Sequence, residues 1–198
     1  MDTHDERNIN IIFNAPDSLA AAAAYKYYYR QLYNYGRKLT DNNSLIEDAI
    51  HDVFVSVWQA HSRNPALDAN KSYVYSSFRR KLFRYHEEAI KRMQREERAT
   101  QNSTPEFGAD HFLIHKEQDQ QLKESILQAL QQLTPRQREA VYLRFYENMQ
   151  YDEIATVMDI SVKATYKLMA RALEELKQLV NIPFYLLLPM LRLLLMKL

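Results

Sequence analysis

Glycine is almost absent from this chain, which has only Gly36 and Gly108 among its 198 residues. All-β domains need glycine in their many tight turns, and nucleotide-binding α/β domains need glycine-rich loops around phosphates. Both architectures are therefore disfavoured. Helices need few glycines, so the composition favours an all-α fold. A chain of this length can bury one or two hydrophobic cores.

Helical periodicity divides the first half of the chain into three segments. Apolar residues recur every three or four positions from about Ser18 to Leu39, from Ser44 to Ala60 and from Ser72 to Arg98. Gly36 lies in the first segment, where glycine costs about 1 kcal/mol against alanine, so we expect a close helix contact there. The buried positions expected in the second segment are Ile46, Ala49, Ile50, Val53, Phe54, Val57 and Trp58.

The second half begins with a break in this periodicity. Residues 99–118 are polar and aperiodic, and they are predicted to be a flexible linker between helical domains at 18–98 and 119–180. Residues 1–17 form an N-terminal extension. The apolar tail at 181–198 falls short of the ~20 residues that span a bilayer. We expect it to pack on the second domain, with a membrane surface or a protein partner as alternatives.

A helix-turn-helix pattern occupies residues 151–178. Asp152 is predicted to cap a short helix and Ser161 a second one, with Asp159 at a turn that needs left-handed backbone. Thr165 stands where an apolar residue is expected. In such a unit the second helix enters the major groove, where basic side chains suit phosphates and guanines. The predicted DNA contacts are Ser161, Lys163, Ala164, Tyr166, Lys167 and Arg171. The alternative is an ordinary helical hairpin with a solvated basic face.

A second basic segment, residues 72–98, interleaves aromatic rings with cations. The net charge of the chain is only +1, yet residues 61–100 hold 10 basic and 5 acidic side chains. Aromatic faces among guanidinium groups suit unstacked bases. The predicted DNA contacts here are Tyr75, Arg79, Arg80, Lys81 and Arg84, whereas Phe78 and Tyr85 are expected in the core. The alternative places all the aromatic rings in the core and the cations on a solvated face.

Three segments, in this order, resemble a bacterial RNA polymerase sigma factor of the small extracytoplasmic-function group. The region 2 helix that grips the clamp of the polymerase β′ subunit is similar to EDAIHDVFVSVWQ. The adjacent segment, which melts and captures the −10 promoter element, is similar to SYVYSSFRRKLFRY. Region 4, which binds the −35 element, is similar to LTPRQREAVYLRFYENMQYDEIATVMDISVKATYKLMARALEEL. The resemblance covers roughly residues 18–98 and 119–180.

The resemblance implies an all-helical initiation factor with two domains, cytoplasmic and monomeric when free. Its implied partners are core RNA polymerase, promoter DNA and an anti-sigma factor. The implied polymerase contacts are Glu47, Asp48, His51 and Asp52, with Phe54 and Trp58 packing the domain. Two positions depart from the family's pattern, because Arg80 replaces a common asparagine and Leu168 a common arginine. The base preferences of the family therefore do not transfer to this chain.

An enzyme active site, a cofactor, a metal and a small-molecule substrate are all unexpected. Without cysteine the chain has no disulfide, thiolate metal site or cysteine nucleophile. His111 and His115 lack the glutamate and third ligand of a zinc motif. The polar N-terminus does not resemble a signal peptide. Two other functions stay open: a free-standing helix-turn-helix regulator that needs no polymerase, and a helical interaction protein that binds no DNA.

Overall fold

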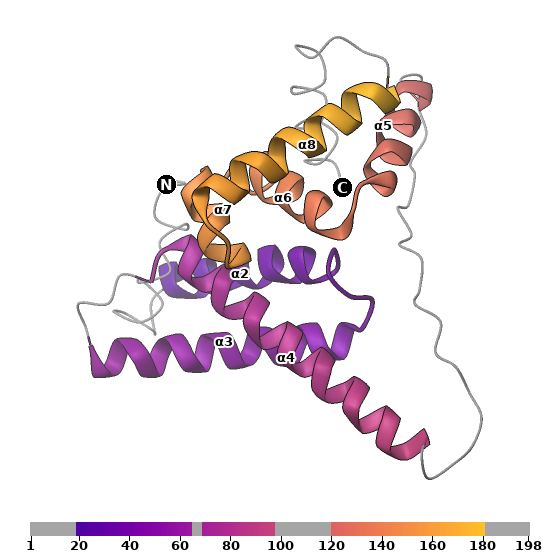
Figure 1. Ribbon diagram of the computed structural model, residues 1–198. Helices are drawn as coiled ribbons and strands as arrows, with labels where there is room; N and C mark the ends of the chain where they lie inside the picture. Colours follow the sequence, from indigo (N-terminus) through magenta and orange to yellow (C-terminus); the bar gives the residue numbers. More distant parts are fainter. Residues whose placement is uncertain (1–18, 65–68, 98–119, 181–198) are drawn as a thin grey trace. The chain divides into compact units, whose positions relative to one another are not determined.

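The computed structural model describes residues 19–64, 69–97 and 120–180 (Figure 1). These residues form seven helices and no strand, which confirms the predicted all-α fold. The chain separates into two compact units, residues 1–110 and 111–198. The predicted N-terminal extension, linker and tail lie outside the described residues, as do His111 and His115. Among the helices that the structure describes, none combines the length and apolar character needed to cross a membrane.

The first unit is built from α2 (Leu19–Gly36), α3 (Asn43–Arg63) and α4 (Lys71–Glu97). Helix α3 packs against both α2 and α4, and α2 also contacts α4 (Figure 1). Each helix buries much of the apolar stripe that its periodicity predicts, and on α3 every residue of that stripe except Trp58 is buried. The fully buried large side chains of this core are Tyr28, Leu32, Tyr35, Ile46, Ile50, Tyr75 and Phe78.

Gly36, the last residue of α2, lies where the three helices of this unit meet. A Cβ atom added at Gly36 would lie 2.8 Å from Cγ2 of Ile46 and 3.0 Å from Cζ of Phe78. Real Cβ atoms do not approach other heavy atoms as closely as 2.8 Å. The close helix contact predicted at Gly36 is therefore confirmed: the absent side chain lets α3 and α4 approach the end of α2.

The second unit contains α5 (Gln120–Gln132), α6 (Pro135–Phe145), α7 (Tyr151–Met158) and α8 (Val162–Val180). Helix α8 contacts the other three helices. Helix α6 begins with a reciprocal cap, in which the Gln137 N–H donates to Oγ1 of Thr134 (3.3 Å) and the Thr134 N–H donates to Oε1 of Gln137 (2.8 Å). Nε2 of Gln137 also donates to Oε2 of Glu175 (2.9 Å), which links α6 to α8.

Candidate nucleic-acid interface

The turn between α7 and α8 has the geometry of a helix-turn-helix. Asp159 ends α7 in the left-handed conformation (φ 54°, ψ 54°), and the Ile160 N–H donates to the carbonyl of Ala155 (3.0 Å). Aspartate tolerates this conformation better than most residues do. Oγ of Ser161 then accepts from the Ala164 N–H (3.1 Å), so the predicted cap of α8 is confirmed.

One detail of this motif differs from the sequence prediction, and the structure explains a second, the presence of Thr165 at an apolar position. Asp152 does not cap α7: the cap residue is Gln150, whose N–H donates to Oε2 of Glu153 (2.7 Å). Asp152 lies in the first turn of α7, where its negative charge interacts favourably with the positive end of the helix dipole. Thr165 is fully buried, and its hydroxyl donates to the carbonyl of Ser161 (3.2 Å). A polar side chain is therefore tolerated in this apolar position because its hydrogen bond is made locally.

The two faces of α8 are chemically distinct. Met169, Ala172 and Leu176 are buried against the rest of the unit. The predicted contacts exposed on the other face are Ser161, Lys163, Tyr166, Lys167 and Arg171, while Ala164 is half-buried. Within the described part of the chain, no ion pair engages the three cations of this face. This face can therefore offer uncompensated positive charge to phosphates and base edges.

The basic segment of the first unit lies on α4. Arg80 and Arg84 are exposed, and Nε of Arg84 lies 3.8 Å from Oε1 of Glu88. The guanidinium of Arg79 lies over the ring of Phe83, 4.6 Å from its centroid. Phe83 is itself 42% exposed. Helix α4 thus carries an exposed aromatic ring beside cations, which is the arrangement that suits an unstacked base.

Three aromatic residues do not lie where the sequence predicted them: Tyr75, Trp58 and Tyr85, of which Tyr85 belongs to the polar network described below. Tyr75, predicted to contact DNA, is fully buried, and its ring centroid lies 5.3 Å from that of Tyr35. It therefore belongs to the core and cannot stack on a base in this structure. Trp58, predicted to pack the domain, is 56% exposed because it lies beyond the edge of the buried stripe of α3. Phe54 does pack as expected: its ring centroid lies 4.5 Å from that of Tyr25.

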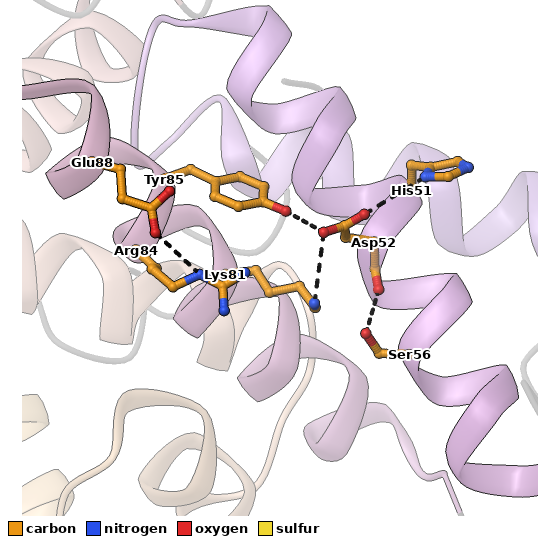
Figure 2. A network of polar contacts seen from close by, with 7 residues as sticks. All are labelled: His51, Asp52, Ser56, Lys81, Arg84, Tyr85 and Glu88. Atoms are coloured by element: carbon orange, nitrogen blue, oxygen red, sulfur yellow. Dashed lines mark hydrogen bonds and ion pairs between the residues drawn. The ribbon is translucent and has the colours of Figure 1, made fainter. Parts of the chain in front are cut away.

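A polar network links α3 to α4 (Figure 2). The Tyr85 hydroxyl donates a hydrogen bond to the carboxylate of Asp52, and Nζ of Lys81 lies 3.9 Å from the same carboxylate. Nδ1 of His51 lies 3.8 Å from its other oxygen. The Asp52 carbonyl also accepts from Oγ of Ser56 (2.6 Å). Tyr85 is thus half-buried at the junction of two helices rather than placed in the core.

The network changes the acidity of its two central groups. The hydrogen bond from Tyr85, and next the positive charge of Lys81, hold the pKa of Asp52 below its usual value despite partial burial. The same hydrogen bond raises the pKa of the Tyr85 hydroxyl, with burial as the second cause. Asp52 and Lys81, which were predicted to contact polymerase and DNA respectively, therefore contact each other.

The other predicted polymerase contacts lie on the exposed side of α3. Glu47, Asp48 and His51 are exposed. Neither Glu47 nor Asp48 takes part in an ion pair among the described residues. Val55 (36% exposed) and Trp58 add apolar surface to the same helix. This side of α3 thus combines carboxylates that lack cationic partners with a large exposed ring.

Two family models match the chain. Residues 24–92 match the model described as Sigma-70 region 2. Residues 123–176 match the model described as Sigma-70, region 4. Together the matches cover more than half of the chain. The chain belongs to the sigma-70 family. Helices α2–α4 of this sigma factor therefore form its region 2, and α5–α8 form its region 4.

Among solved structures, the sigma factor is similar to a chain of the co-crystal structure of the sigma factor RpoE in complex with the anti-sigma factor NepR from Bartonella quintana. The TM-score is 0.56 at 18% sequence identity, over 81% of this chain and 96% of that chain. This likeness indicates a shared fold. A comparison with curated protein sequences finds no match. The family models identify regions 2 and 4 of the sigma-70 family, and the extracytoplasmic-function group stays a prediction from the sequence. Promoter-directed transcription is the function of this family and of the chain.

Sequence reasoning missed two side chains of this sigma factor. Phe83 supplies the exposed ring on α4 that was attributed to Tyr75. Tyr151, at the start of α7, stacks on Tyr166 of α8 with ring centroids 4.2 Å apart. An aromatic residue in each helix of the helix-turn-helix was the available signal, but their contact depends on how the two helices cross.

Proposed function

We propose that this sigma factor docks α8 in the major groove of the −35 element. The observation that carries the proposal is the exposed face of α8, where Lys163, Lys167 and Arg171 lie beyond a helix-turn-helix turn and lack ionic partners among the described residues. In helix-turn-helix proteins the N-terminal half of the second helix reaches base edges. Lys163 and Lys167 are in that half, and Arg171, a turn further on, is suited to a phosphate.

Helix α4 is proposed to capture the opened −10 element. Arg80 and Arg84 would bind phosphates of the displaced strand, and Phe83 would stack on a base. Arg79 and Lys81 support this surface from its edge, because the first lies over Phe83 and the second faces Asp52. The sequence predicts a linker at residues 99–118, and its length would let the two regions occupy both promoter elements.

Core RNA polymerase is proposed to bind the exposed side of α3. Glu47 and Asp48 would face positive charges on the polymerase clamp, and His51, Asp52 and Trp58 border them. We propose that an anti-sigma factor also binds this protein, because the similar structure holds the sigma factor RpoE in complex with the anti-sigma factor NepR. We propose that the free protein is a cytoplasmic monomer that performs no catalysis of its own.

The polymerase proposal is tested by pull-down of purified core enzyme. Asp48→Arg reverses a charge on the proposed contact surface, and we expect at least about tenfold less core enzyme to be retained. The matched control is Glu174→Arg, which reverses an exposed carboxylate on α8 and should leave retention unchanged. Retention of core enzyme by Asp48→Arg at the wild-type level would refute the assignment of α3.

A further inference from the structure

An arginine and two tyrosines form a column that joins three helices of region 4. The guanidinium of Arg144 on α6 lies 5.2 Å from the ring centroid of Tyr151, the first residue of α7. The Tyr151 ring in turn stacks on Tyr166 of α8, with centroids 4.2 Å apart and planes inclined by 26°. Nη1 of Arg144 donates to the carbonyl of Met149 (2.7 Å) and to Oε1 of Gln150 (3.2 Å). The column is therefore held at its Arg144 end by hydrogen bonds.

The Tyr166 end of the column lies among the cations of α8. Tyr166 is 55% exposed although one face of its ring is covered by Tyr151. Lys163 lies one helical turn before it and Lys167 directly after it. An exposed tyrosine on a helix can exchange between staggered rotamers. A stacked aromatic partner favours the one rotamer in which the rings meet.

We propose that Tyr151 is a positioning residue for −35 recognition, which fixes the ring of Tyr166 on the DNA-facing surface of α8. Arg144 in turn holds the Tyr151 ring, because its guanidinium lies over that ring. The inference rests on the proposed docking of α8 in the major groove. A tyrosine presents an apolar ring edge, which suits a thymine methyl group, and a hydroxyl, which can donate or accept a hydrogen bond. A ring held in one orientation favours one base at the position it contacts, because the ring cannot rotate to fit a different base there.

The test is a double-mutant cycle read out as promoter preference. Full-length protein is combined with core polymerase on a promoter library randomised in the −35 element, and the transcribed templates are sequenced. Tyr151→Leu and Tyr166→Leu should each lower enrichment of the preferred base by about tenfold at the same positions. The double variant should lose no more than either single variant, because Tyr151 acts through Tyr166. Preference in the −10 element should not change.

Two controls separate positioning from stability. Tyr151→Phe keeps the stacked ring and should retain the wild-type preference. Tyr146→Leu removes another stacked pair of this unit, Tyr142 with Tyr146, whose ring centroids lie 4.7 Å apart. This variant should also retain the wild-type promoter preference. If Tyr151→Leu unfolds region 4, three-bond NMR couplings of Tyr166 in the folded wild-type chain still test the inference. They should report one χ1 rotamer, and averaging over several would overturn it.

Two library outcomes also overturn the inference. One is a wild-type preference in Tyr151→Leu, and the other is a double variant whose loss is the product of the two single losses. Failure of the underlying proposal looks different. In that case the wild-type holoenzyme would transcribe the library without enriching any −35 sequence, which would show that α8 does not recognise the −35 element.

Discussion

The hydroxyl of Tyr85 on α4 donates a hydrogen bond to the carboxylate of Asp52 on α3, 33 residues earlier in the chain (Figure 2). The ammonium of Lys81 approaches the same carboxylate to 3.9 Å. The acidic helix and the basic helix of region 2 are therefore joined by a charged hydrogen bond near the proposed −10 surface. Asp52 thus has a structural role beside its predicted contact with polymerase.

Removing the Tyr85 hydroxyl should weaken region 2. We expect Tyr85→Phe to lower the free energy of unfolding by about 1 kcal/mol, which is less than the ~1.5–3 kcal/mol of a buried charged hydrogen bond because solvent reaches the carboxylate. The single tryptophan, Trp58, lies in α3 and reports unfolding of this region by fluorescence in urea. Tyr73→Phe on the same helix is the matched control. Equal stability of the two variants would contradict a stabilising role for the hydrogen bond.

The same hydrogen bond should depend on pH at both extremes. The pKa of Asp52 is lowered, so its contribution is complete above the unfolded pKa of about 3.9 and is lost as the pH falls through the folded value. The pKa of Tyr85 is raised, so its contribution is complete below about 10 and is lost as the pH rises through its folded value. The stability difference between wild type and Tyr85→Phe should therefore be constant from about pH 5 to 9 and shrink outside that range. A difference that persists unchanged at pH 2 to 3 would argue against this linkage.

Gly36→Ala should destabilise region 2 although alanine is the better helix former. Its Cβ would lie 2.8 Å from Cγ2 of Ile46, and relieving that overlap requires the Ile46 side chain or its helix to shift within a packed core. Overpacking typically costs about 1–3 kcal/mol, and the helix-propensity gain offsets about 1 kcal/mol of it, so we expect a net loss of about 1 kcal/mol in the free energy of unfolding. Urea unfolding followed through Trp58 measures the change. A stability equal to or above that of wild type would mean that the close contact is not rigid.

Lys163 should contribute one phosphate contact or one base contact, and salt dependence distinguishes the two. If Lys163 binds a phosphate, Lys163→Ala in the holoenzyme should weaken promoter binding and reduce the slope of log K against log salt by about one unit. Lys177→Ala, near the opposite end of α8, is the matched control and should change neither. Unchanged affinity and slope in Lys163→Ala would remove this side chain from the interface.

Local signals accounted for much of the fold. The stripe from Ile46 to Trp58 predicted the buried face of α3 with the exception of Trp58, and the close contact at Gly36 was expected from the presence of glycine inside a helical segment. Ser161 and Asp159 marked the helix-turn-helix turn because caps and left-handed residues depend on neighbours in the chain. These features need no knowledge of how helices cross.

Apart from the cap of α7, which was assigned to Asp152 instead of Gln150, the errors arose where helix crossing decides the outcome. Helix α4 is covered by both α2 and α3, so its buried arc is wide enough to include Tyr75 and leaves Phe83 outside. Periodicity alone cannot tell which of two aromatic residues on such a helix is buried and which is exposed. The contacts of Tyr85 with Asp52 and of Tyr151 with Tyr166 likewise join different helices. Single-sequence patterns can point to the residue types in such pairs, but they cannot show that the two side chains meet.

Transcription with purified core RNA polymerase tests the central claim most directly. The template is a library of promoter fragments, and the 5′ ends of the transcripts are mapped with and without this protein. We expect defined start sites only when the protein is present, and a shared −10 and −35 sequence pattern upstream of them. Stable binding to core enzyme without any defined start site, or no binding to core enzyme, would contradict the account.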